Sequence, residues 1–370
     1  MTNAKSRLFN RLLQALGFAA ALAMLWFTFR GLNLAETRTI ITRVGPMALL
    51  ILLPFLVAMM LDTLAWKQQF LYLKRPMPIQ ALLGVRLASE GVLLSVSGGP
   101  VLSEGVAPYI LHKRWRVPYS ESIATLSVRK ALLVVSQALY VGLGAILGFA
   151  FLRNTSAGVV GVPGLEWVMV LVSGILLIVS VIFTATLTQG SAGAAINRWL
   201  AKVRHRRLTP LLDALRTGLL ATNQHLQRAL GRTPQDAIHL VIIYFLAWLI
   251  EAFETWLILR LLGVDIGFVE VWAFEPALSL LRHLVFFVPA GLGFQDVGYV
   301  AFLTAFGVPD PLTVGSAFIV LKRSKELLWA AFGLGLLYLF FRGARAPEAN
   351  PRPDRPVEGP DIKRVLLICG

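Results

Sequence analysis

Apolar runs long enough to cross a membrane recur along the whole of this chain. The clearest runs extend over residues 12–29, 47–66, 121–152, 165–187, 238–262 and 313–341. A helix needs about 20 mostly apolar residues to span the hydrocarbon core of a bilayer. The chain has 56% hydrophobic and only 15% charged residues, a composition that few soluble domains share. The sequence therefore predicts an all-α fold, a polytopic membrane helix bundle.

Two further regions are apolar but are interrupted by glycine and proline. The breaks lie at Gly98, Gly99 and Pro100 in residues 81–111, and at Pro289, Gly291 and Gly293 in residues 271–306. Each piece is about half a membrane thick, and backbone that leaves the helix at this depth needs protein or trapped water as its partner. We predict about six full spans plus two re-entrant (broken) helical hairpins. Eight or more full spans remain an alternative, because loop charge does not distinguish the two versions.

The two broken regions repeat the same order of features. Residues 98–133 and 290–328 both run from a Gly-containing break to an acid, and then through a Pro-containing loop into a long helix with an arginine near its start. Basic loops favour the cytoplasm, which puts the two hairpins on opposite sides. The pattern predicts an inverted repeat, at about residues 81–152 and 271–341, of the kind that builds a midplane site with alternating access. Chance similarity among Gly-, Pro- and Leu-rich segments is the alternative.

Charged side chains in or beside the hairpins form the candidate site, because an ionisable group at membrane depth is costly and needs a partner. The predicted substrate-binding residues are Glu90, Glu104, Arg129, Asp296 and Arg323. A guanidinium suits a phosphate group because it donates two parallel hydrogen bonds. The alternative is that both arginines pair with Glu104 and Asp296 and only fix the fold. A secondary charged set comprises Glu251, Glu254, Glu275 and Arg282. Buried ion pairing is the favoured interpretation of this set, and the alternative is that these residues carry protons or line a lipid path.

The remaining segments are basic or rich in proline. Residues 190–235 carry eight basic side chains against one acid, with apolar residues spaced three and four apart. This predicts an amphipathic segment that lies in the headgroup region and contacts anionic headgroups, rather than nucleic acid. Residues 1–341 are predicted to form a single integral membrane domain, and residues 342–370 a disordered tail. Loop charges predict a multi-pass membrane protein with both termini in the cytoplasm.

No motif for catalysis or metal binding is visible in the sequence. The five histidines have no cysteine or carboxylate at metal-ligand spacing beside them, and neither a P-loop nor a hydrolase elbow is present. We therefore expect no metal site, no cofactor and no enzymatic activity. Two alternatives stay open: a membrane-embedded enzyme that uses Glu251, Glu254 or Asp296 as acid or base on a lipid-linked substrate, and a scaffold for lipid-synthesis enzymes.

Both hairpins resemble one known family. The stretch PAGLGFQD, followed by GVP and LKRS, is similar to the second half of the flippase-like membrane family, which is the transmembrane region of bacterial lysylphosphatidylglycerol synthases and their stand-alone relatives. The stretch SGGPVLSEGVAPYIL, followed by SVRK, resembles its first half. The resemblance covers about residues 12–341 and implies a translocase that moves a phospholipid or a polyisoprenoid-type lipid between leaflets.

Three details qualify this resemblance. The family often has PGGLG followed by Glu, whereas this chain has Ala290 and Gln295–Asp296, which leaves the headgroup chemistry open. Synthase members carry a soluble aminoacyl-transfer domain after the last span, whereas a short tail follows here, so lipid lysylation is not expected. The wording GLGFQDVGY resembles stand-alone relatives found in hopanoid-synthesis loci.

Overall fold

The structure, a computed structural model, shows an all-helical bundle. It describes residues 34–95, 99–161, 163–188, 224–231, 233–284 and 293–342. Within these ranges the regular structure is helix throughout, and the predicted all-α class is confirmed. Several predictions fall outside the described residues: the span at 12–29, most of the basic segment at 190–235, the tail after residue 342, and the break residues Gly98, Pro289 and Gly291.

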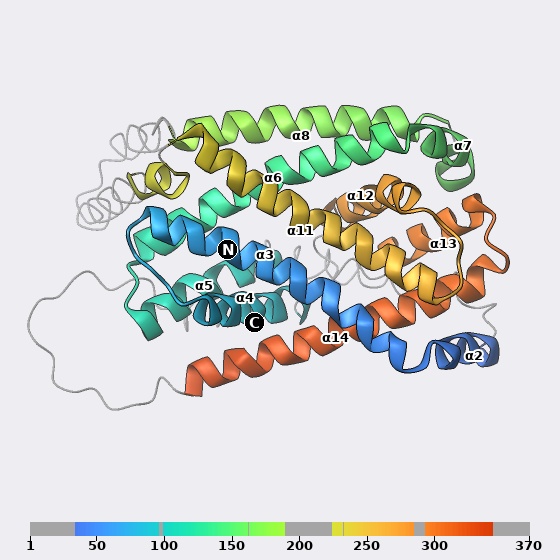
Figure 1. Cartoon of the computed structure of the whole chain (residues 1–370), viewed down its shortest axis with the longest axis horizontal. Helices are drawn as coiled ribbons and strands as arrows, with labels where there is room; N and C mark the ends of the chain where they lie inside the picture. Colours follow the sequence, from blue (N-terminus) through green and yellow to red (C-terminus); the bar gives the residue numbers. More distant parts are fainter. Residues whose placement is uncertain are drawn as a thin grey trace, which may run out of the picture.

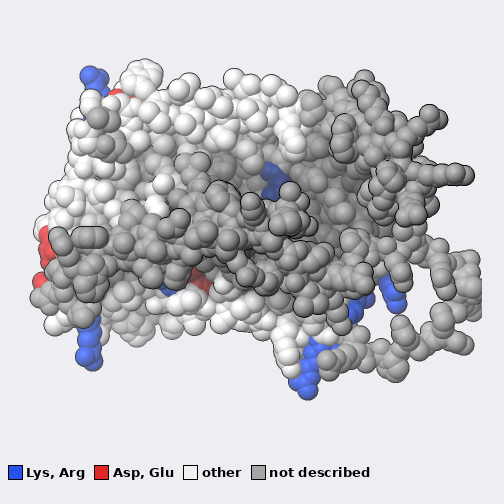
Figure 2. All heavy atoms as spheres, turned by 180° about the vertical axis from the view of Figure 1, so that it is seen from behind, with Lys and Arg blue, Asp and Glu red and all other residues white. Residues whose placement is uncertain are grey.

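Five described helices are long and apolar enough to cross a membrane. They occupy Ala35–Tyr72, Tyr119–Leu147, Leu165–Thr184, Pro234–Leu261 and Pro311–Arg342, and they coincide with five of the six runs predicted as full spans. Their outer faces expose large apolar side chains, for example Leu171 and Ile178, which are 64% and 61% exposed. The described surface in Figure 2 is mostly uncharged. Apolar surface of this extent identifies an integral membrane protein.

The first half of the bundle comprises four helices, and a short entry segment, α2 (Leu34–Val44) and the 3₁₀ helix η1 (Gly45–Ile51), precedes them. The four are α3 (Leu52–Tyr72), α4 (Ile79–Ser95), α5 (Gly99–Trp115) and α6 (Tyr119–Leu147). The predicted break separates α4 from α5, and Gly99 and Pro100 are the first two residues of α5. With 17 residues each, α4 and α5 are shorter than the roughly 20 residues of a typical spanning helix.

The second half repeats this order. It comprises α11 (Pro234–Leu261), α12 (Phe268–Leu284), α13 (Phe294–Phe306) and α14 (Pro311–Arg342). Gly293 caps α13 with a left-handed φ of 83°, a conformation that glycine adopts without strain. The Asp296 carboxylate accepts a hydrogen bond from the Gly293 amide at 2.9 Å. The predicted break residue and the predicted acid thus start the same helix.

Two described helices follow the first half. They are α7 (Phe149–Val160) and α8 (Leu165–Thr188), joined by a turn in which Gly161 has a left-handed φ of 77°. The helix α8 packs along α6, where the Ser173 hydroxyl donates to the Ala138 carbonyl at 2.8 Å. These helices cover one side of the bundle (Figure 1).

The two halves run in opposite directions through the bundle (Figure 1). The helices α3 and α11 lie against each other, and the Gln69 amide of α3 donates to the Tyr244 hydroxyl of α11 at 3.0 Å. Figure 1 shows the α4–α5 hairpin near one end of the long axis and the α12–α13 hairpin near the other. Each long helix crosses the hairpin of the opposite half, since α14 packs on α4 and α6 packs on α12.

The links that lead from the hairpins into the long helices also correspond. In each link a residue with left-handed backbone is followed by valine and proline: Arg116–Val117–Pro118 in the first half and Gly307–Val308–Pro309 in the second. The φ angles of Arg116 and Gly307 are 53° and 80°. In both links the valine amide donates back to the preceding helix, at 3.3 Å for Val117 and 3.1 Å for Val308. The helix order, the opposite directions and these links are the features that the predicted inverted repeat requires.

Candidate functional site

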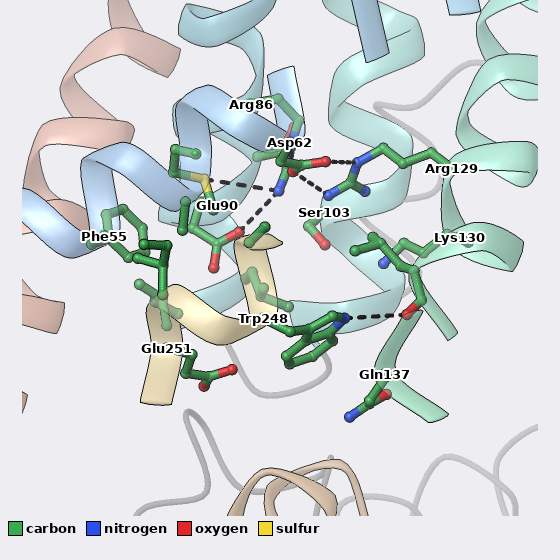
Figure 3. A pocket seen from close by; sticks show the side chains of 18 of the residues that line it. Phe55, Asp62, Arg86, Glu90, Ser103, Arg129, Lys130, Gln137, Trp248 and Glu251 are labelled. Carbon is green, nitrogen blue, oxygen red and sulfur yellow. Dashed lines mark hydrogen bonds and ion pairs between the residues drawn. The ribbon is translucent and has the colours of Figure 1, made fainter. Parts of the chain in front are cut away.

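A cavity of about 380 Å³ lies between the two halves, with described walls from α3, α4, α5, α6, α11 and α14 (Figure 3). Charged side chains dominate its polar lining. The described lining includes six carboxylates and five cationic groups: Asp62, Glu90, Glu104, Glu251, Glu254 and Glu326, with Arg86, Arg129, Lys130, Lys322 and Lys325. Ionisable groups inside a membrane bundle commonly mark a substrate or ion pathway. This cavity is therefore the candidate site.

Asp62 of α3 is the centre of the first-half part of the site. Its Oδ1 and Oδ2 accept hydrogen bonds from Nε and Nη2 of Arg129 at 2.7 and 2.6 Å. Nε of Arg86 also donates to Oδ2, at 2.8 Å. All three side chains are at least nine-tenths buried. The rigid fork of a guanidinium matches a carboxylate, so this Arg–Asp–Arg cluster holds α3, α4 and α6 together through charge-assisted bonds.

Glu90 and Glu104 extend the first-half wall. Glu90 lies one turn after Arg86 on α4, and their side chains approach to 3.5 Å. Glu104 of α5 pairs with Lys130 of α6 at 2.6 Å, and this pair is more open, with 38% and 51% of the side chains exposed. Arg129 thus pairs with Asp62, whereas the fold-fixing alternative expected Glu104 as its partner.

Lys322 of α14 is the centre of the second-half part. Its ammonium donates to the Tyr299 hydroxyl at 2.6 Å, to the Thr255 hydroxyl at 3.1 Å and to Oε1 of Glu275 at 3.2 Å. The Tyr299 hydroxyl in turn donates to the same Glu275 oxygen at 2.6 Å. Glu275 has 0% exposure and does not line the cavity itself, whereas Lys322 does. Lys322 therefore connects the cavity to a cluster buried behind it.

Two more ion pairs lie along α14. Lys325 pairs with Glu254 of α11 at 2.6 Å. Arg323 binds Asp296 of α13 at 2.7 Å and Glu326 at 2.6 Å, so its pairing with Asp296 matches the fold-fixing alternative. Neither Arg323 nor Asp296 is among the lining residues of the cavity. Their geometry favours a role in holding α13 against α14.

The structure divides the residues predicted from sequence into three groups. Glu90, Glu104, Arg129, Glu251 and Glu254 line the cavity. The second group, Asp296, Arg323 and Glu275, is paired beside it. The third group comprises Arg282 and the break residues. Arg282 belongs to α12, but its side chain lies outside the described part of the structure. Of the break residues, Gly99 and Pro100 begin α5, and Gly293 caps α13.

Asp62, Lys130, Lys322 and Lys325 contribute to the site and were missed by the sequence prediction. The signal for Asp62 is present in the sequence, because it is the one acid inside the apolar run at residues 47–66. A lone carboxylate in a span has to find a cation. Lys322 and Lys325 lie close to the predicted Arg323 on α14. Only the helix geometry shows that the two lysines line the cavity and that Arg323 does not.

Gln137 of α6 offers the cavity a donor. Its side chain is 7% exposed and lines the cavity, and within the described residues its Nε2 atom has no hydrogen-bond partner. Trp248, on the facing wall, donates its indole N–H to the Leu133 carbonyl at 3.2 Å and stacks on Tyr140. Leaving a buried donor without a partner costs about 1–3 kcal/mol. Gln137 is therefore suited to hold a polar molecule in the cavity (Figure 3).

Among the described residues, no group of three or more His, Cys, Asp and Glu side chains could hold a metal ion. The site offers hydrogen bonds and charged groups, and the numbers of its positive and negative charges are nearly equal.

Comparison with known proteins identifies the family. The model of the lysylphosphatidylglycerol synthase TM region matches residues 14–321, more than four fifths of the 370 residues. A search of curated proteins returned no match. The match includes both hairpins and most of the cavity wall, and it associates the chain with membrane proteins of lipid metabolism or transport. The chain belongs to the lysylphosphatidylglycerol synthase transmembrane-region family.

Proposed function

We propose that this protein binds a polar lipid headgroup in its central cavity and carries the lipid between the two leaflets of a bacterial inner membrane. The observation that carries the proposal is a charged cavity of about 380 Å³ between two halves of opposite direction, inside a bundle with apolar outer faces. A headgroup that crosses hydrocarbon loses its hydrogen bonds to water, at a cost of several kcal/mol for each polar group. The cavity wall replaces those bonds, while the acyl chains can stay in the surrounding lipid.

The wall residues divide the work. Asp62 occupies two of the five N–H donors of Arg129, and guanidinium donors of this kind suit a headgroup phosphate. Gln137 adds a neutral donor. Glu90, Glu104 and Glu251 can accept hydrogen bonds from hydroxyl or amine groups. The two hairpins lie near opposite ends of the bundle and would open the cavity to one side at a time.

A flipping assay in reconstituted vesicles tests the proposal. Fluorescent phosphatidylglycerol in the inner leaflet is protected from an added quencher, so a translocase raises the quenched fraction above that of protein-free vesicles. Gln137→Leu removes the unpaired donor at nearly constant volume, and we expect it to slow flipping several-fold. Glu121→Gln is the matched control, because Glu121 pairs with Arg75 outside the cavity. This variant should flip lipid at the wild-type rate.

The outcomes separate the function from the residue. If wild type moves neither phosphatidylglycerol, phosphatidylethanolamine nor a polyisoprenyl phosphate, the proposed function is wrong. If wild type and Gln137→Leu flip lipid equally, only the role of Gln137 is lost. If mass spectrometry of the same vesicles detects a new lipid product, the enzyme alternative replaces the proposed function.

A further inference from the structure

The cluster of Glu275, Tyr299 and Lys322 has no role in the proposed contacts to the headgroup. These three side chains are 0%, 2% and 4% exposed. Oε1 of Glu275 receives both the Tyr299 hydroxyl and the Lys322 ammonium. Within the described residues, Oε2 of Glu275 has no hydrogen-bond partner. A buried carboxylate oxygen without a donor is an open position for one proton.

Charged and neutral polar groups surround Glu275 on the helices that pack around it. On α11, Glu251 and Glu254 act electrostatically on Lys322, as does Glu326 of α14. From α13 come Tyr299 and, hydrogen-bonded to it at 3.3 Å, the neutral Gln295. The helix α6 meets α12 through Tyr140 and Trp272, and the single charged residue of α7, Arg153, is exposed. Lys322 is therefore the cation in contact with Glu275, and it faces the cavity.

The charge of the cavity lining sets a condition for the binding of an anionic headgroup. Six carboxylates against five cations give the described lining no excess of positive charge, and the cations described above each contact a carboxylate. An anionic headgroup that enters this lining meets net repulsion. Neutralising one carboxylate that is paired with a lining cation lowers the repulsion, because that cation then needs a new counter-ion.

We propose that Glu275 is a proton-binding site that couples proton uptake to the binding of an anionic headgroup through Lys322. One proton from the cavity adds to the Glu275 carboxylate, and the charge of the Glu275–Lys322 pair rises from zero to plus one. A headgroup with one negative charge then returns the pair to zero when it contacts Lys322. Proton and lipid bind together and leave together, so a proton gradient would drive the lipid. This coupling rests on the proposed function, and it identifies the driving ion.

Proton uptake by purified protein in detergent tests the site without transport. Short-chain phosphatidylglycerol is added in weak buffer with a pH indicator, and wild type should take up about one proton for each lipid bound. Glu275→Gln should take up none, because its amide stands for the protonated carboxyl group. Glu121→Gln should behave as wild type. Phosphatidylethanolamine, whose headgroup has no net charge, should cause no uptake in any of the three. Wild type without uptake, or Glu275→Gln with full uptake, would overturn the proposal.

A second variant keeps the test decisive if Glu275→Gln does not fold. Tyr299→Phe removes the hydroxyl that donates to the ionised carboxylate. It should move the pH dependence of proton uptake to higher pH, because the charged form loses a stabilising bond. An unchanged pH dependence in this variant counts against Glu275 as the proton site.

Vesicles with an imposed pH difference separate this coupling from the proposed function. In wild type, a difference of one pH unit should enrich phosphatidylglycerol up to about tenfold in one leaflet. Glu275→Gln should still exchange the lipid but without enrichment. Exchange in wild type that ignores the gradient would contradict the coupling and leave the translocase intact. If no vesicle shows exchange, the translocase fails, and proton uptake in detergent still decides the site.

Discussion

The two halves of the cavity place ionic clusters on corresponding helices but build them from different chemistry. In the first half, Asp62 on α3 holds Arg86 of α4 and Arg129 of α6. In the second half, Thr255 on α11 and Glu275 on α12 hold Lys322 of α14. Guanidinium groups stay protonated in proteins, whereas a buried lysine, glutamate or tyrosine can exchange a proton. The two guanidinium groups therefore give the first cluster positive charges that stay fixed, whereas the proposed coupling changes the charge of the second cluster.

This difference assigns the halves separate tasks. In the proposed translocase, the fixed cluster keeps α3, α4 and α6 in one arrangement and offers a headgroup phosphate the same donors at every stage. The exchangeable cluster lies on α11, α12, α13 and α14, where the proposed change of one charge would alter the contact between the second hairpin and its long helix. The two halves supply similar scaffolds, and Lys322 occupies in the second half the place that Arg129 occupies in the first. In the proposed coupling, this difference makes only the second half responsive.

The largest predicted effect comes from removing the shared carboxylate of the fixed cluster. Asp62→Asn leaves the buried guanidinium group of Arg129 without its counter-ion and leaves Arg86 with Glu90, at 3.5 Å, as its carboxylate partner. Breaking a buried ion pair in this way costs about 3–5 kcal/mol. The measurement is the free energy of unfolding in mixtures of SDS and mild detergent.

The matched substitution in the second half is Glu275→Gln. It removes the counter-ion of one ammonium instead of two guanidinium groups, and Lys322 keeps Tyr299 and Thr255 as partners. We expect a loss of about 1–3 kcal/mol, the cost of a weakened buried hydrogen bond. Equal losses for the two variants would mean that the clusters do not differ in the way proposed.

The sequence predicted the helices well and the register of the site less well. Five spans and both hairpins follow from long apolar runs and from Gly–Pro breaks, which are local signals. The sequence prediction treats Arg129 and Arg323 as counterparts in the two halves. The ion pairs instead make Lys130 the counterpart of Arg323, because Lys130 pairs with Glu104 as Arg323 pairs with Asp296. The prediction is therefore wrong by one residue. One residue turns a helix by about 100°, so a basic residue near the start of a helix does not reveal which face it occupies.

The second pair of predictions compares the two acids that follow the breaks. Asp296 is 2% exposed and binds both Arg323 and the Gly293 amide, which starts α13. Asp296→Asn should lower the free energy of unfolding by about 2–4 kcal/mol, because a charge-assisted cap and one ion pair weaken together. Glu104 and Lys130 are far more exposed, so Glu104→Gln should cost about 0–1 kcal/mol. A loss for Glu104→Gln as large as that for Asp296→Asn would show that the exposed pair is a structural requirement.

The last comparison concerns the two places where a long helix crosses the opposite hairpin. A Cβ atom at Gly333 of α14 would overlap the Leu87 carbonyl oxygen of α4, and one at Gly144 of α6 would lie 2.5 Å from the Trp272 carbonyl oxygen of α12. Small residues let membrane helices approach closely, so both crossings depend on a missing side chain. Gly333→Ala and Gly144→Ala should each lower the free energy of unfolding by about 1–3 kcal/mol through overpacking.

Gly335 provides the control on α14, because a Cβ atom there meets nothing within 4 Å. Gly335→Ala should be neutral or should raise the free energy of unfolding by up to about 1 kcal/mol through helix propensity. A loss at Gly333 without one at Gly144 would indicate that α4 and α14 form a tight contact while α6 and α12 can shift. That result would place the moving interface in the second hairpin, on the same side of the molecule as the exchangeable cluster.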